Sequence, residues 1–222
     1  MTMQRPKVIF LDAVGTLFGV RGSVGEVYSA IAGQFGVQVP AESLNEAFLK
    51  AFAASKAPVF PGSTPEEIPH CEFEWWLVIA RRTFQQVGVH DQFANFTDFF
   101  DELYHHFATA QPWFIYPDVL PSLEKWQRLG IELGIVSNFD SRIRYVLEAL
   151  KLDKFFTSVT ISTETGFAKP DPRIFAVALE KHHCAAKDAW HIGDSSKEDL
   201  QGAKAAGLRA ILLERKSQLP GA

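Results

Sequence analysis

An aspartate at the end of a short apolar stretch is the first residue whose position suggests chemistry. Four apolar residues, 8–11, lead into Asp12, and Gly15 and Thr16 follow within a turn. A continuous apolar run bounded by a turn is typical of a strand buried on both faces of a parallel sheet. Ligands of open α/β sheets bind beyond the carboxyl ends of the strands, so Asp12 is a candidate reactive group. The alternative is that Asp12 only forms the turn.

Two further polar groups follow apolar stretches later in the chain. Ser137 and Asn138 end the strand predicted over 131–136, where a hydroxyl and backbone N–H groups could hold an anion. Ser137 could equally be a helix cap. Lys169 precedes Pro170 in a loop stiffened by proline, which would present its ammonium at a fixed place unless it is a solvated surface lysine.

A pair of aspartates flanks the turn after the strand predicted over 190–192. Asp194 follows Gly193, and Asp199 comes at the start of the next predicted helix. Carboxylates on such a turn, opposite another strand-end carboxylate, suit Mg²⁺, which takes one or two protein carboxylates and keeps several waters. A simpler interpretation is that Ser196 and Asp199 form a capping box, and both interpretations can hold together.

The elements that position these groups lie in two kinds of sequence pattern. Residues 23–107 show helical apolar spacing with a proline-rich break at 55–70, which predicts an inserted helical bundle with a long loop. Beyond this segment, strand and helix patterns alternate. We therefore expect an α/β fold: a three-layer core with a parallel sheet formed by 1–18 and 112–222, and a helical cap at 19–111.

Composition narrows the classes of function. The 222 residues carry a net charge of -4 with both signs interspersed, so there is no basic surface for nucleic acid or membrane. Cys71 and Cys184 lie far apart, and we expect reduced thiols. The first strand leaves no room for a signal peptide, and no apolar run has membrane-spanning length. We expect a cytoplasmic protein whose partner is a small molecule, with neither nucleic acid nor membrane as a partner.

Taken in order, the four polar groups form a recognisable series. Asp-x-x-Gly-Thr, Ser-Asn, Lys-Pro-Asp and Gly-Asp-x₄-Asp, with a helical segment inserted after the first, resemble the haloacid dehalogenase superfamily over nearly the whole chain. The resemblance implies a Rossmann-like core and the helical cap of subfamily I. It extends to the rhythmically-expressed-gene-2-like branch of the superfamily.

The resemblance also implies roles for individual residues. Asp12 matches the nucleophile, which would form an aspartyl-phosphate. Three residues would hold the transferred, phosphorylated group of the substrate: Ser137, Asn138 and Lys169. Four would form the Mg²⁺ site: Asp12, the backbone carbonyl of Val14, Asp194 and, through water, Asp199.

Val14 departs from the pattern of the family's phosphatases, which carry a second aspartate at this position to protonate the leaving oxygen. Valine can move no proton, and general acid–base catalysis is worth about 10²- to 10⁴-fold in rate. We therefore expect a Mg²⁺-dependent phosphatase that acts on good leaving groups, such as acyl or aryl phosphates, and poorly on simple alkyl phosphates. Two alternatives stay open: a hydrolase of a carbon–halogen or carbon–phosphorus bond, and a catalytically weak or inactive binding or regulatory protein.

Other polar residues receive lesser roles. His191 lies within a short predicted strand and is expected to be a core histidine rather than a catalyst. In helical-capped members of the family the cap sets specificity, which makes Arg21, Lys56 and His70 candidates for substrate contacts.

Overall fold

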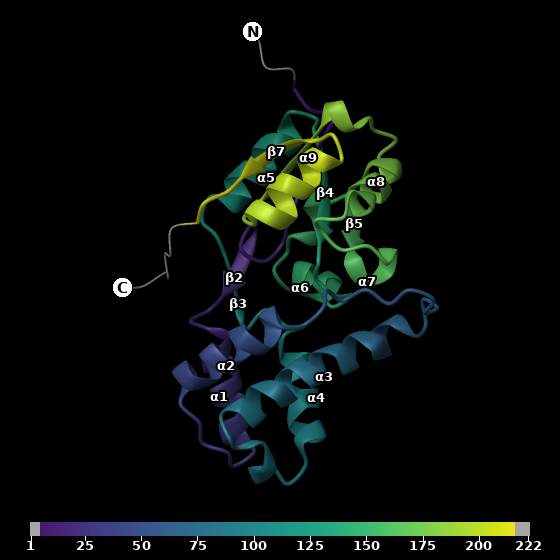
Figure 1. Ribbon diagram of the computed structural model, residues 1–222. Helices are drawn as coiled ribbons and strands as arrows, with labels where there is room; N and C mark the ends of the chain where they lie inside the picture. The colour runs from purple at the N-terminus through teal and green to yellow at the C-terminus, as the bar shows by residue number, and fades with distance from the viewer. Residues whose placement is uncertain (1–4, 216–222) are drawn as a thin grey trace. The chain divides into compact units, whose positions relative to one another are not determined.

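The computed structural model of the protein describes residues 5–215 and divides into two compact units (Figure 1). Within this range the first unit comprises 5–19, 57–63 and 114–215, and the second comprises 20–56 and 64–113. Residues 57–63, part of the loop expected in the cap, thus group with the first unit. The function of the inserted segment as a cap stays a prediction.

The first unit is built on a five-stranded parallel sheet in the order β5-β4-β1-β6-β7 (Figure 1). Its strands are β1 (Val8–Leu11), β4 (Glu132–Ser137), β5 (Ser158–Ile161), β6 (Ala189–Gly193) and β7 (Arg209–Leu212). Leu11 at the end of β1 is in register with Ile135 and Ile192 on its two neighbours. The predicted α/β fold with a parallel sheet is confirmed.

Helices flank this sheet and bury β1 completely. Val8 and Phe10 pack against Ile174 and Phe175 of α8, which starts after the capping residue Asp171. The helices of the first unit are α5 (Val119–Arg128), α6 (Ile143–Ala149), η2 (Asp153–Phe155), α7 (Ser162–Thr165), α8 (Pro172–Lys181), η3 (Ala186–Asp188), η4 (Ser196–Gln201) and α9 (Gly202–Ala205). A strand enclosed in this way needs apolar residues at every position, which is the pattern of residues 8–11.

The second unit is a helical bundle with an aromatic core. Its helices are α1 (Val24–Gln34), α2 (Ala41–Ala53), α3 (Ile68–Gln86), η1 (His90–Gln92) and α4 (Phe96–His106). Phe84 of α3 meets Phe99 of α4 edge to face, with ring centroids 5.0 Å apart. The four α-helices expected from apolar spacing are therefore present. Aromatic residues such as Phe84 and Phe99 lie in the core of the bundle, as expected, whereas Phe35 and Phe52 are exposed.

Two of the four places where the chain passes between the units, 19/20 and 113/114, lie in one small sheet. This sheet has two strands, β2 (Phe18–Val20) and β3 (Trp113–Ile115).

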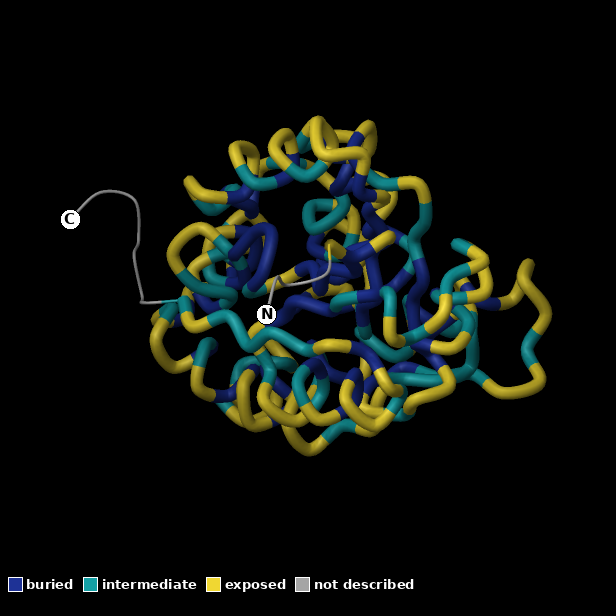
Figure 2. Tube along the Cα trace, turned by 90° about the horizontal axis from the view of Figure 1, so that it is seen from above, coloured by how far each residue is buried: buried dark blue, intermediate teal, exposed yellow. Residues whose placement is uncertain are grey.

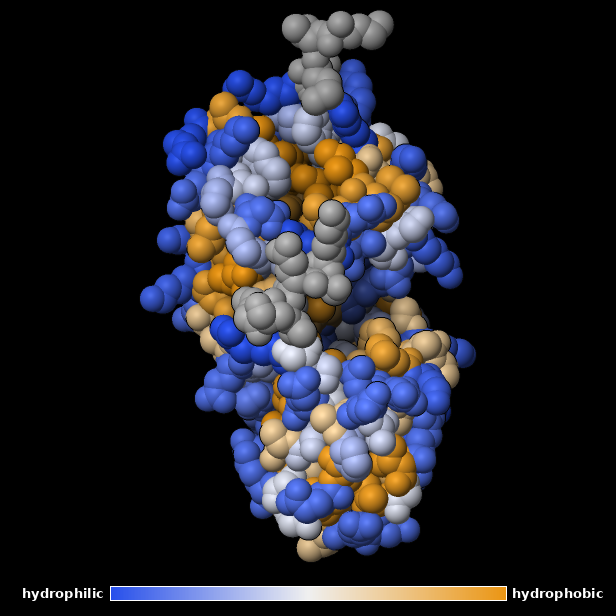
Figure 3. All heavy atoms as spheres, turned by 90° about the vertical axis from the view of Figure 1, so that its left-hand side faces the viewer, coloured by the Kyte–Doolittle hydropathy of each residue, from blue (hydrophilic) through white to orange (hydrophobic). Residues whose placement is uncertain are grey.

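Figure 2 shows buried segments enclosed by helices whose outer turns are exposed. Figure 3 shows hydrophilic residues over much of one face, with hydrophobic residues in smaller patches. In the described part of the chain, no helix has both the length and the apolar character needed to cross a bilayer.

Candidate active site

The carboxyl ends of three adjacent strands bring together residues that are far apart in sequence. Asp12 follows β1, Ser137 ends β4, and Asp194 follows β6. Because β1 lies between β4 and β6, Asp12 occupies the centre of this edge. Lys169 reaches the same place from the loop before α8. The edge therefore collects three of the four sequence motifs around the carboxylate of Asp12, and the lysine of the remaining motif joins them.

The two carboxylate oxygens of Asp12 have different surroundings. Oδ1 accepts hydrogen bonds from Ser137 Oγ at 3.1 Å and from Lys169 Nζ at 2.6 Å. Oδ2 accepts a long hydrogen bond, 3.5 Å, from Thr16 Oγ1. The backbone N–H of Asp12 donates to Ile192 O at 3.0 Å, which fixes the start of the loop. Asp12 is thus a rigidly held, buried carboxylate that keeps electron pairs available on one oxygen.

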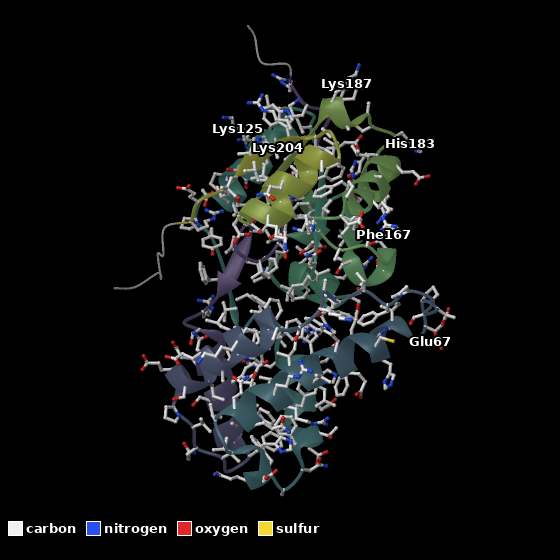
Figure 4. All side chains as sticks on the ribbon, viewed as in Figure 1. Glu67, Lys125, Phe167, His183, Lys187 and Lys204 are labelled. Atoms are coloured by element: carbon white, nitrogen blue, oxygen red, sulfur yellow. The ribbon has the colours of Figure 1, made fainter. Side chains whose placement is uncertain are left out.

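Lys169 is a buried ammonium between two carboxylates. Its Nζ lies 2.6 Å from Asp12 Oδ1 and 2.6 Å from Asp199 Oδ1. Burial alone would lower the pKa of Lys169, but the two carboxylates outweigh it and raise the pKa above the usual value. Lysines elsewhere in this unit, such as Lys125 and Lys204, are exposed on its helices (Figure 4). The interpretation of Lys169 as a solvated surface lysine is therefore wrong.

Asn138 holds the main chain of Lys169 through its side-chain amide. Its Oδ1 accepts from Lys169 N at 2.8 Å, and its Nδ2 donates to Lys169 O at 3.0 Å. Nδ2 also donates to Glu198 Oε2 at 3.2 Å. Both amide protons are thus engaged within the protein. Phosphate binding by Asn138 stays a prediction, and in this geometry it would use the backbone N–H rather than the amide.

Three carboxylates form a group that could hold a cation. One oxygen each of Asp12, Asp194 and Asp199 lies within 4.8 Å of the others. Partial burial, together with the negative charges of Asp12 and Asp199, raises the pKa of Asp194 from 3.8 to about 6. A bound cation would relieve this repulsion, and hard oxygen donors are those that Mg²⁺ prefers.

Asp199 and Asp194 differ in how many hydrogen bonds their carboxylate oxygens accept from the protein. Asp199 Oδ1 accepts from Lys169 Nζ and from His191 Nε2, and its Oδ2 accepts from Ser195 N. Burial opposes ionisation of Asp199, but the hydrogen bonds from His191 and Lys169 hold its pKa well below the usual value. Asp194 reaches the surface. This fits the predicted roles, direct coordination by Asp194 and water-mediated contact by Asp199.

The loop after Asp12 is shaped to receive the carboxylate of Asp194. Gly15 has a φ of 85°, and a Cβ at this position would collide with Asp194 Oδ2. The main chain that carries the Val14 carbonyl thus lies directly against Asp194. The donor set fits the predicted Mg²⁺ site, because a backbone segment and two carboxylates meet at one point.

Two residues of the site were not recognised from the sequence. His191 lies in β6 as a buried histidine, as expected, but its Nε2 also lies 2.8 Å from Asp199 Oδ1. Burial lowers the pKa of His191, so the neutral imidazole donates this hydrogen bond. Glu198, on η4, contacts Asn138. Of these two residues, only His191 could have been found from the sequence. Side chains alternate along a strand, so His191, two residues before Gly193, lies on the same face of β6 as Gly193.

Arg215, the last described residue, forms a hydrogen bond with the loop after Asp12. Its Nη2 donates to Thr16 O, and its Nη1 pairs with Asp118. Its guanidinium lies 4.0 Å from the ring centroid of Tyr116. The loop is therefore fixed from both the sheet and the C-terminal segment.

Comparison with known proteins finds a matching family and several relatives. Residues 6–207 match the family described as haloacid dehalogenase-like hydrolase. The haloacid dehalogenase-like hydrolase domain-containing protein 3 of Danio rerio is 34% identical over 94% of this chain and 85% of its own length. The rhythmically expressed gene 2 protein of Drosophila melanogaster is 29% identical over 97% of this chain and 86% of its own.

Solved structures show the same fold. A haloacid dehalogenase-superfamily (HAD) phosphatase from Thermococcus onnurineus superimposes with a TM-score of 0.62 at 22% identity, covering 96% of this chain and 88% of that one. The HAD-hydrolase YfnB from Bacillus subtilis, bound to magnesium, superimposes with a TM-score of 0.69 at 17% identity, covering 97% and 92%. The resemblance found in the motifs is confirmed, and the chain belongs to the haloacid dehalogenase-like hydrolase family.

Proposed function

We propose that the protein is a Mg²⁺-dependent phosphatase that forms an aspartyl-phosphate on Asp12. The observation that carries the proposal is the buried carboxylate of Asp12, held by Ser137 and Lys169 and facing Asp194. An Asp12 oxygen would attack phosphorus, and the bond to the leaving oxygen would break with its electron pair. Water would then hydrolyse the acyl phosphate and restore the carboxylate.

The residues around Asp12 supply the positive charge that such an attack requires. Lys169 and Ser137 both reach Asp12 Oδ1, so both would also reach a phosphoryl group bound at this carboxylate. Bound Mg²⁺, held by Asp12, Asp194 and the Val14 carbonyl, would offset the repulsion between the carboxylate and the phosphate. Asp199 would keep Lys169 charged and in place.

Val14 limits which phosphates can be substrates. The residue is 37% exposed, and its aliphatic side chain can neither donate nor accept a proton. A leaving group that departs as a stable anion, such as a carboxylate or a phenolate, needs no proton from the enzyme. We infer that small acyl or aryl phosphates are the substrates, and that alkyl phosphates react slower by about 10²- to 10⁴-fold.

Val14 also favours a second candidate function, that of a binding or regulatory protein with weak or no turnover. The pocket residues would then bind Mg²⁺ and a phosphorylated ligand without releasing product. Cleavage of carbon–halogen or carbon–phosphorus bonds is the less favoured alternative, because Asp194 supplies a metal-binding carboxylate that suits phosphoryl transfer.

Hydrolysis of p-nitrophenyl phosphate and acetyl phosphate in the presence of Mg²⁺ tests the proposal. We expect turnover that is lost on chelation and in Asp12→Asn, which keeps the volume and removes the nucleophilic charge. Mg²⁺-dependent binding of a phosphate mimic without turnover would support the binding protein. Chloride release from a 2-haloacid without metal would contradict the phosphatase.

A further inference from the structure

Glu198 is a carboxylate at the site to which the proposed reaction assigns no role. It is half-buried on η4, and its Oε2 accepts a hydrogen bond from Asn138 Nδ2 at 3.2 Å. The two residues are 60 positions apart in sequence. The contact joins η4 to the residue that follows β4.

The helix start leaves the side chain of Glu198 free to reach Asn138. Ser195 is the N-cap, and its Oγ accepts a hydrogen bond from Glu198 N at 3.1 Å. The interpretation of Ser196 and Asp199 as a capping box is therefore wrong, because the cap lies one residue earlier. In a capping box the glutamate side chain returns to the N–H of the capping residue. Here Asp199 Oδ2 takes the N–H of Ser195 at 3.0 Å instead.

The winding of η4 also helps to place Glu198. Residues Ser196–Gln201 form a π-helix, which rotates less per residue than the about 100° of an α-helix. Successive side chains therefore diverge less, and Glu198 and Asp199 can both face the site. Such π-turns occur frequently at functional sites.

Glu198 reinforces the orientation of the Asn138 amide that the main chain of Lys169 also favours. With Nδ2 toward Glu198, the amide donates to Lys169 O and accepts from Lys169 N, and every group is paired. With the amide rotated by half a turn, its oxygen would meet the carboxylate of Glu198 and the carbonyl of Lys169. Both contacts would then be repulsive, because neither partner has a proton to donate.

We propose that Glu198 is a positioning residue that fixes the Asn138 amide and, through it, the main chain of Lys169 beside Asp12. The inference rests on the proposed function, since it concerns the residue that would hold the phosphoryl group. Losing a hydrogen-bonding partner one step removed from such a group typically costs about 10- to 100-fold in affinity or activity.

The test measures binding of beryllofluoride, a mimic of the phosphoryl group on aspartate, in the presence of Mg²⁺. ¹⁹F NMR reports both the affinity and the surroundings of the bound fluorides. We expect Glu198→Ala to weaken binding about 10- to 100-fold and to shift the fluorine resonances. Glu198→Gln keeps an acceptor for Asn138 and should stay within about threefold of the unchanged protein. Lys197→Ala, exposed on the same helix, is the matched control and should change nothing.

A double-mutant cycle separates positioning from an independent effect of charge. In the Asn138→Ala background, Glu198→Ala should cause no further loss, because the link to Lys169 is already gone. Additive losses in affinity would overturn the positioning role of Glu198 and leave the proposed function standing. A Glu198→Ala variant that binds beryllofluoride like the unchanged protein would do the same. If the unchanged protein binds no beryllofluoride with Mg²⁺, the proposed function fails and the inference with it. Circular dichroism and thermal melting confirm that each variant is folded.

Discussion

The ammonium of Lys169 lies 2.6 Å from a carboxylate oxygen of Asp199, and both side chains are almost completely buried. Asp12 completes the group at the same distance from the ammonium. Such buried charges hold each other in their ionised forms, because removal of one leaves the others uncompensated. The position of Lys169 therefore matters to folding as well as to the proposed chemistry.

Replacement of Lys169 by methionine should remove both activity and stability. The buried carboxylates of Asp12 and Asp199 would lose their counter-charge, and we expect the free energy of unfolding to fall by about 3–5 kcal/mol. Urea denaturation measures the change. Lys204→Met, at an exposed position of the same unit, should leave the unfolding curve within about 0.5 kcal/mol of the unchanged protein. Equal effects of the two substitutions would contradict the structural role of Lys169.

Replacement of Val14 by aspartate should extend activity to alkyl phosphates. The new carboxyl can protonate the leaving oxygen, and we expect kcat/KM for an alkyl phosphate to rise by up to about 10²- to 10⁴-fold, with a smaller change for an aryl phosphate. Val14→Asn is the control, because it is polar but transfers no proton. Should the aspartate and asparagine variants behave alike, proton transfer at residue 14 is not what limits the reaction.

The pKa of Asp194 predicts how pH affects the metal-free protein. Folding raises this pKa from 3.8 to about 6, so the folded state binds the proton more tightly than the unfolded chain does. The free energy of unfolding should therefore fall as pH rises from about 4 to about 6, and stay low above that range. Thermal melting of the metal-free protein across this range checks the sign.

Mg²⁺ should reverse this loss of stability at neutral pH. The ion requires ionised Asp194, so we expect Mg²⁺ to raise Tm more at about pH 7.5 than at about pH 5. Asp194→Asn should remove both the pH-dependent loss and most of the Mg²⁺ effect. An equal rise in Tm at the two pH values would argue against Asp194 as a ligand.

Gly15 and Gly130 provide a matched pair that separates backbone strain from damage to the metal site. Both have positive φ, 85° and 69°, so alanine at either should cost about 1–2 kcal/mol. A Cβ on Gly15 collides with Asp194, whereas a Cβ on Gly130 has no atom within 4 Å. Isothermal titration should therefore show weakened Mg²⁺ binding in Gly15→Ala and unchanged binding in Gly130→Ala. Equal Mg²⁺ affinity in the two variants would show that Asp194 does not need the space at Gly15.

Only the tertiary structure decided how the side chains of the site are connected. Asn138 contacts Lys169 across 31 positions and Glu198 across 60, and no local pattern encodes which groups its amide meets. The N–H of Ser195 donates to Asp199 rather than to Glu198, and this choice depends on where β6 places the turn. Arg215 reaches Thr16 across 199 positions.

The sequence by itself predicted the alternation of strands and helices around the parallel sheet and the main candidate residues, but it did not predict the small sheet of β2 and β3. Short, largely apolar runs bounded by turn residues marked the ends of β1, β4 and β6, and with them Asp12, Ser137 and Asp194. Apolar spacing likewise predicted the four α-helices of the second unit. Periodicity reports which face of an element is buried, whereas a hydrogen bond between side chains depends on distances that only the folded chain sets. The fold class and the candidate residue Asp12 could therefore be predicted from local sequence patterns. The hydrogen bonds that hold Asp12 in place depend on the tertiary structure.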